Sequence, residues 1–254
     1  MTPEEFATIR KMTVAYMATL DLATCKQEMI ANGLLTQNAK LLKGENDNYG
    51  LELLPSVLSG RNLCAGAGKC KLTCLAFSGV GNLFKSKKMI AGEELSLPIM
   101  AKARRTFVFI ADPDWFIGLL KAEIEYKAAL SRFSGKKVFF RLNTTSDVDW
   151  RFLTDEMPHI AFYDYCKVWD RVSTLNYRIT FSVSETTTDE MIRSKLENGE
   201  TVAVVFHKVP KTFLGFPVVD GDLNDDRSAD PMGVVVGLKY KVTVGGKDDT
   251  DFVR

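Results

Sequence analysis

The stretch YRITFSVSETTTDEMIRSKLENGETVAVVF, from Tyr177 to Phe206, decides the fold class. Its two ends, Tyr177–Val183 and Thr201–Phe206, are short apolar runs rich in β-branched and aromatic residues, which is typical of strands covered on both faces. Between them, Thr188–Asn198 has helical spacing, a threonine-rich start and an Asn-Gly stop. A strand, a helix and a second strand in this order form one unit of a parallel α/β sheet.

Similar runs occur on both sides of this unit. A helix from Asp114 to Leu130 is predicted because Asp112 can cap it and Pro113 suits its first turn. Further strands are predicted at Lys137–Leu142, Ile160–Tyr163, Phe216–Asp220 and Gly233–Leu238, a strand at Tyr49–Leu58, and a helix at Asp147–Met157. The alternation predicts an α/β fold, with a full or partial (β/α) barrel favoured over an open doubly wound sheet.

Length and composition are those of a globular protein. The chain has 254 residues, of which 46% are hydrophobic and 26% charged, and no linker rich in proline, glycine or serine divides it. We expect one domain, with a helical N-terminal segment at 1–45 and a barrel-like core at 46–254. No apolar stretch reaches about 18 residues, so no membrane span is predicted. Met1–Leu20 does not resemble a signal peptide, which favours a reducing cytoplasm.

A loop after the first predicted strand holds three of the five cysteines: Cys64-Ala65-Gly66-Ala67-Gly68-Lys69-Cys70-Lys71-Leu72-Thr73-Cys74. Several thiolates on one glycine-rich loop are typical of a metal or iron–sulfur site. A [4Fe–4S] cluster on three cysteines leaves one iron open, which suits the radical chemistry of S-adenosylmethionine enzymes. The spacing here, C-x5-C-x3-C, differs from their usual C-x3-C-x2-C.

Other interpretations of this loop stay open. A structural zinc ion usually takes four protein ligands, so the fourth would come from Cys25, Cys166, His159 or His207. Redox or disulfide chemistry, or no chemistry, are the remaining alternatives.

Polar residues follow several predicted strands, where ligand sites of α/β folds collect. We therefore expect one pocket that faces the cysteine loop. Its predicted cofactor-binding residues are Asn143, Ser182, Ser184, Glu185 and Asp220, and the catalytic candidates are Asp147, Glu185 and His207.

The formal net charge is only +1, but every charged residue from Arg61 to Gly92 is basic. Such a run can attract phosphate or nucleic acid, although a solvated lysine-rich surface is the common alternative. The predicted nucleic-acid-binding residues are Lys69, Lys71, Lys85, Lys87, Lys88, Arg104 and Arg105, with Phe77, Phe84 and Phe107 available for base stacking.

Three segments resemble the gene product 88 family of phages and plasmids, a family of unknown function. They are the cysteine loop, Arg141-Leu142-Asn143-Thr144-Thr145-Ser146-Asp147, and Phe162-Tyr163-Asp164-Tyr165-Cys166-Lys167. Ala65 stands where the family has a proline, and the gap before Cys70 is shorter. The resemblance implies a viral or mobile-element protein in the cytoplasm of a bacterial host. The order of elements also looks like a distant radical S-adenosylmethionine barrel, which is an analogy of architecture alone.

Two main functions follow from these features. The first is an iron–sulfur, S-adenosylmethionine-dependent enzyme that acts on nucleotides or nucleic acid. The second is a non-enzymatic protein with a structural zinc or cluster, which binds nucleic acid or a host protein.

Overall fold

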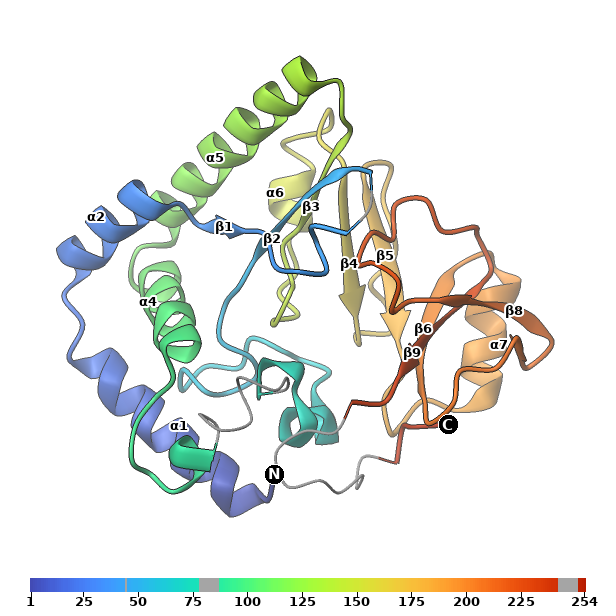
Figure 1. Cartoon of the computed structure of the whole chain (residues 1–254), viewed down its shortest axis with the longest axis horizontal. Coiled ribbons are helices and arrows are strands. Elements are labelled where there is room, and N and C mark those ends of the chain that lie inside the picture. Colours follow the sequence, from blue (N-terminus) through green and yellow to red (C-terminus); the bar gives the residue numbers. More distant parts are fainter. Residues whose placement is uncertain (44, 78–86, 242–250) are drawn as a thin grey trace.

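The computed structural model describes residues 1–43, 45–77, 87–241 and 251–254 (Figure 1). Lys85 and Phe84 therefore lie outside the described residues. The α-helices are α1 (Pro3–Ala18), α2 (Leu22–Asn32), α4 (Leu97–Ala111), α5 (Pro113–Ser134), α6 (Arg151–Thr154) and α7 (Asp189–Glu197), and two 3-10 helices are η1 (Gly68–Thr73) and η2 (Leu75–Phe77).

One sheet runs through the molecule in the order β1-β2-β3-β4-β5-β6-β9-β8-β7. All neighbours from β2 to β8 pair in parallel, and only the two-residue edge strands β1 and β7 are antiparallel. The strands are β1 (Leu35–Thr36), β2 (Asp47–Leu51), β3 (Val138–Arg141), β4 (Phe162–Cys166), β5 (Tyr177–Ser182), β6 (Thr201–Phe206), β7 (Thr212–Phe213), β8 (Phe216–Asp220) and β9 (Val235–Lys239). The predicted α/β class is confirmed.

The sheet is open, so the prediction of a full barrel is wrong. A barrel needs its first and last strands to pair, whereas the strand order of the described chain ends at β1 on one side and β7 on the other. Strands β2 to β6 are nevertheless neighbours in chain order, as in a barrel. The side chains of Lys40, ahead of β2, and Asp222, after β8, meet at 3.1 Å.

The two faces of the sheet differ in chemistry. On the helix-covered face, the rings of Tyr49, Phe140, Phe162 and Tyr177 stand in register on four neighbouring strands, with centroids 5.9 to 6.3 Å apart. Residues of α2 and α5 pack in the same core. The opposite face is polar: Arg141, Tyr163 and Arg178 alternate with those rings. Tyr163 and Thr180 on this face are fully buried, so the strands are covered on both faces as predicted, although the second face is polar.

The predicted helix starts are confirmed by their caps. Asp112 accepts the backbone N–H of Trp115 at the start of α5, and Thr188 accepts that of Met191 at the start of α7. The N-terminal segment forms α1 and α2, as its spacing predicts. The sequence interpretation missed α4, although Pro98 in its first turn is a recognisable signal.

Two predicted boundaries are wrong. The strand from Tyr49 ends at Leu51, and the chain then turns at Ser56, whose φ is 52°. The helix predicted from Asp147 to Met157 is reduced to α6. Its first turn is lost because Asn143 holds the preceding loop: the Asn143 Oδ1 accepts hydrogen bonds from Ser146, Val148 and Trp150.

No helix in the part of the chain that the structure describes is long and apolar enough to cross a membrane.

Truncating the inward face of α5 should destabilise the whole fold. Ile124 is fully buried in the core between α5 and the sheet, so we expect Ile124→Ala to lower the free energy of unfolding by about 2–5 kcal/mol. Tyr126→Ala, on the exposed side of the same helix, should change it by about 0.5 kcal/mol or less. Urea denaturation measures both values, and equal losses would contradict this packing.

Candidate functional site

The cysteine loop, Cys64 to Cys74, lies over the carboxyl ends of β3, β4 and β5. Cys64 forms a parallel bridge with Asp147, after β3. Gly66 lies against Lys167, after β4, and the Lys69 backbone N–H donates to Glu185, after β5, at 2.7 Å. The loop therefore contacts the polar ends of three successive parallel strands.

Two glycines allow this close approach. A Cβ at Gly66 would lie 2.6 Å from the Lys167 Cβ and 2.9 Å from its carbonyl oxygen. At Gly68, where φ is +45°, a Cβ would lie 2.0 Å from the Glu185 carboxylate. The glycines that break this loop in the sequence thus serve its packing against the strand ends.

The three thiols of the loop are half-buried and influence one another. Burial raises the pKa of Cys64 to about 12, although the Ser56 backbone N–H donates to its sulfur at 3.0 Å. Burial also raises the pKa of Cys74, and repulsion from Cys70 and Cys64 adds to this effect. Cys64 and Cys70 therefore lie within electrostatic reach of Cys74, and burial keeps Cys64 and Cys74 as protonated thiols.

A preassembled metal centre is not seen at these thiols. Across the described residues, no three His, Cys, Asp or Glu side chains are arranged to hold a metal ion. The loop brings together the donor types that a cluster needs, but their convergence on one point stays a prediction.

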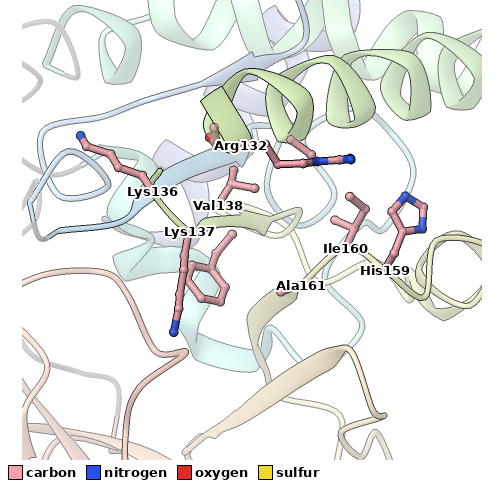
Figure 2. Close-up of a pocket in the computed structure, with 10 residues that line it drawn as sticks. Arg132, Lys136, Lys137, Val138, His159, Ile160 and Ala161 are labelled. Atoms are coloured by element: carbon pink, nitrogen blue, oxygen red, sulfur yellow. The ribbon is translucent and has the colours of Figure 1, made fainter. Parts of the chain in front are cut away.

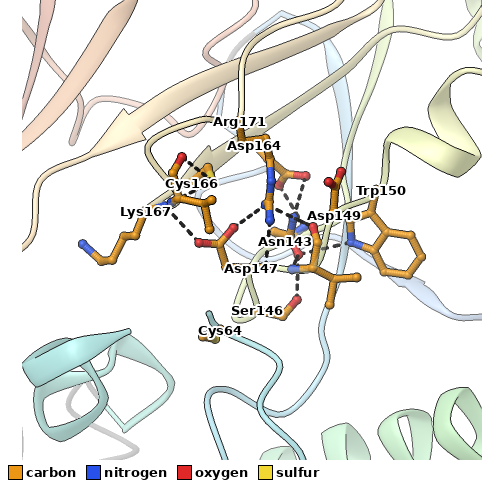
Figure 3. Close-up of polar contacts among 12 residues, drawn as sticks. Cys64, Asn143, Ser146, Asp147, Asp149, Trp150, Asp164, Cys166, Lys167 and Arg171 are labelled. Atoms are coloured by element: carbon orange, nitrogen blue, oxygen red, sulfur yellow. Dashed lines mark hydrogen bonds and ion pairs between the residues drawn. The ribbon is translucent and has the colours of Figure 1, made fainter. Parts of the chain in front are cut away.

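The candidates for a fourth zinc ligand are widely separated. Cys25 is buried on α2, His159 pairs with Glu125 at 2.8 Å, and the His207 ring packs against Tyr240. Cys166 is different, because Asp147 raises the pKa of Cys166 as well as that of Cys64, after the larger effect of burial on each. Asp147 thus stands near both cysteines, and Figure 3 draws these three residues together.

Asp147 connects the start of the cysteine loop to the chain that follows β4 (Figure 3). One carboxylate oxygen pairs with Arg171 at 2.5 Å and the other accepts the Lys167 backbone N–H at 2.9 Å. Its own backbone N–H donates to Leu63, next to the first cysteine, at 2.7 Å. Asp147 was predicted as a catalytic candidate, and its contacts instead place it between the cysteine loop and the chain after β4.

Asn143, a predicted cofactor-binding residue, has its side chain engaged within the protein. Besides the three bonds that its oxygen accepts, its amide donates to the Val148 carbonyl at 2.8 Å. Its backbone N–H donates to Asp164, which also accepts the Tyr177 hydroxyl at 2.7 Å. Sequence reasoning missed Asp164. Its signal is a lone carboxylate inside the apolar strand FYDYC.

The remaining predicted pocket residues divide into two groups. Ser182 accepts a hydrogen bond from the Lys167 ammonium at 3.0 Å, and the hydroxyls of Ser184 and Thr187 are hydrogen-bonded to each other. Both serines lie next to the loop. Glu185 Oε2 is buried beside the loop and has no hydrogen-bond partner among the described residues. Asp220 is exposed after β8, where it accepts the Asp222 backbone N–H.

The C-terminal residues border the loop, which the sequence did not indicate. Asp251 pairs with Lys69, and Phe252 is buried with the Lys167 ammonium 5.2 Å from its ring centre.

Most of the predicted basic residues have partners within the protein. Arg104 pairs with Glu28 at 2.9 Å, Lys88 with Glu94 at 3.1 Å, and Arg105 donates to the Glu52 carbonyl. Lys71 and Lys87 are exposed. Phe77 is fully buried, so the prediction that its ring stacks on bases is wrong. Phe107 is partly buried against the core, and its stacking stays a prediction.

A groove of about 570 Å³ lies at the amino ends of β3 and β4, at the opposite ends of these strands from the cysteine loop (Figure 2). Arg132, Lys136, Lys137 and His159 give it a basic lining. His159, a candidate fourth zinc ligand, lines it, but the three loop cysteines and the predicted catalytic and cofactor-binding residues do not.

Removing the Asp147 charge should destabilise the protein strongly. Asp147→Asn leaves Arg171, whose side chain is 5% exposed, without its anion, so we expect a loss of about 3–5 kcal/mol in unfolding free energy. The exposed pair Asp149–Arg151 is the matched control, because Asp149→Asn should cost about 1 kcal/mol or less. Chemical denaturation would contradict the assignment if both variants lost the same amount.

Asp164 should make stability fall as pH rises through the weakly acidic range. Burial raises its pKa to about 7 in the folded chain, against about 4 in an unfolded one. From pH 4 to 7 the folded state thus holds a proton that the unfolded state releases, and this contribution to stability is lost by about pH 7. From pH 4 to 7 the unfolding free energy of the wild type should fall relative to that of Asp164→Asn. The exposed Asp155→Asn should show the same pH dependence as the wild type.

Comparison with known proteins gives one match. The family model of gene product 88 matches residues 32–254. Neither the curated proteins nor the solved structures contain a match to the chain. The matched part spans every strand of the sheet and the whole cysteine loop. The resemblance seen in the sequence is thereby confirmed, and this chain belongs to the gene product 88 family.

Proposed function

We propose that Cys64, Cys70 and Cys74 bind a [4Fe–4S] cluster and that the protein is an S-adenosylmethionine-dependent enzyme of the radical type. A nucleotide or nucleic acid is the proposed substrate. The proposed location is the cytoplasm of a bacterial host, where cysteines stay reduced.

One observation carries this proposal: the cysteine loop follows β2, the first strand of the parallel run, and lies over the carboxyl ends of the next three strands. In α/β folds these ends form the ligand site. A group bound on the loop would therefore face the side chains that follow β3, β4 and β5.

The donor set suits a cluster with an open iron. Three cysteines come from one loop, and a bound cluster of this kind supplies the electron for radical chemistry with S-adenosylmethionine. Because the thiols lose protons when they become ligands, cluster assembly should be favoured at higher pH. Assembly must also draw Cys70 and Cys74 toward Cys64, which η1 and the chain around it would have to allow.

The chain's own residues have separable roles in this proposal. Asp147 holds the start of the loop against the sheet through Arg171 and Lys167. Glu185 Oε2, buried and without a hydrogen-bond partner, is a free acceptor beside the loop. It suits an ammonium or hydroxyl group of a bound cofactor.

Zinc is the alternative that one observation favours. Cys64 and Cys166 both neighbour Asp147, so Cys166 is the best-placed fourth ligand for a structural zinc ion. In that case the protein would be a binding protein for nucleic acid or a host factor.

Anaerobic reconstitution with iron and sulfide tests the proposal. We expect brown protein with broad visible absorption and about four iron atoms per chain. Cys64→Ala, Cys70→Ala and Cys74→Ala should each lose most of the iron, because each removes one ligand. Cys25→Ala and Cys166→Ala are matched controls that should retain it. The reduced, reconstituted protein should then cleave S-adenosylmethionine.

Colourless protein with one zinc ion, lost in Cys166→Ala, would contradict the cluster and support the binding protein. An intact cluster without cleavage of S-adenosylmethionine would contradict the enzyme alone.

A further inference from the structure

The sheet face opposite the helices is rich in hydrogen-bond donors. Arg141 on β3 and Arg178 on β5 are its cations, and the hydroxyls of Tyr163, Tyr165 and Thr180 lie on the same face. The one carboxylate on strands β3, β4 and β5, Asp164, stands on the helix side with Phe162 and Cys166 and comes no closer than 4.0 Å to the Arg141 guanidinium. The bare face would therefore attract an anion.

An acidic segment, residues 221–233, covers this face (Figure 1). Asp225 pairs with Arg141 at 2.5 Å, and the Arg178 guanidinium donates to the carbonyls of Ser228 and Pro231. The segment carries four carboxylates, Asp222, Asp225, Asp226 and Asp230. Asp225 is the one that pairs with a cation of the sheet face, whereas Asp230 pairs with Arg227 of the same segment at 3.2 Å.

Polar contacts hold the acidic segment in place. Asp222 pairs with Lys40 at 3.1 Å, and Asp226 accepts the Asn46 amide at 2.7 Å. Its two large apolar side chains, Leu223 and Met232, are 67% and 78% exposed. The segment contains no helix or strand. A covering segment held by charge and hydrogen bonds, with its large apolar side chains in solvent, can be displaced by a competing anion.

The covered face also keeps donors that the segment does not use. Tyr163 and Thr180 are fully buried, and within the part of the chain that the structure describes their hydroxyls and that of Tyr165 have no hydrogen-bond partner. Arg141 lies 4.8 Å from the Tyr165 ring centre. Burial raises the pKa of both tyrosines, so they remain O–H donors. Unused buried donors beside arginine indicate a site that a ligand completes.

We propose that this face binds an oligophosphate group, such as the di- or triphosphate chain of a nucleotide, and that the acidic segment occupies the site as an internal mimic of it. Asp225 stands on Arg141 where a phosphate would bind. Arginine forks and hydroxyl donors match phosphate oxygens, and donors that extend from Arg141 on β3 across β4 to Arg178 on β5 suit a chain of several phosphates. This inference stands on the sheet face alone and does not need the cysteine loop to hold a cluster.

Calorimetric titration of the full-length, as-purified protein with inorganic tripolyphosphate tests the site. Asp225→Asn weakens the mimic, so tripolyphosphate should bind about tenfold more tightly than to the wild type. Asp170→Asn makes the same charge change at an exposed position outside the segment and should bind like the wild type.

Tyr163→Phe tests the unused donors. The variant should bind tripolyphosphate about tenfold more weakly, because one hydrogen bond to a charged ligand is lost. Its unfolding free energy should not fall, since the hydroxyl has no partner in the protein. Tyr126→Phe, at an exposed position on α5, is the matched control.

Hydrogen exchange and the comparison of the variants provide two further tests of the site. Hydrogen exchange in residues 221–233 should rise when tripolyphosphate binds, because the segment is displaced. Unchanged binding in both Asp225→Asn and Tyr163→Phe would overturn the site, as would a loss of stability in Tyr163→Phe, which would mean that buried water satisfies the hydroxyl. Equally tight binding of citrate would overturn the phosphate class.

Discussion

The candidate site depends on the contacts of Asp147 with Leu63, Lys167 and Arg171. The Asp147 backbone N–H holds Leu63 at the start of the cysteine loop, while its carboxylate joins Arg171 to the chain after β4. A buried ion pair adds little net stability, but it fixes the geometry of the groups around it. The other contacts that keep the loop over the strand ends are the close approach of its glycines to Lys167 and Glu185 and the hydrogen bond from the Lys69 backbone N–H to Glu185.

The two faces of the sheet contribute differently to the stability of the fold. The aromatic row from Tyr49 to Tyr177 and the helices supply the buried apolar area that stabilises the fold. The opposite face carries Arg141 and Arg178 and buries hydroxyls without partners, which costs stability. Both the cysteine loop and this face border β5.

The sequence predicted much of the fold because its signals are local. The caps at Asp112 and Thr188 and the apolar runs at β5 and β6 depend only on neighbouring residues, and their boundaries agree with the structure to within a few residues. The first turn of the predicted helix at Asp147 was lost to Asn143, a contact that no periodicity encodes. The open sheet could not be foreseen, because closure depends on whether distant edge strands meet.

Part of the candidate site was predictable for the same reason. Because ligand sites follow strands, the sequence predicted that polar residues at the strand ends would face the cysteine loop, and Asp147, Ser184 and Glu185 lie on that side. Asp220, the last residue of β8, instead accepts a hydrogen bond within the turn that follows that strand. The central role of Asp164 and the docking of Phe252 are products of tertiary packing. We propose that the loop presents a cluster to the strand ends, which diffraction at the iron absorption edge from anaerobically reconstituted crystals would reveal. One iron peak is expected among Cys64, Cys70 and Cys74, facing Glu185, whereas iron-free, well-ordered cysteines in the same crystals would rule the cluster out.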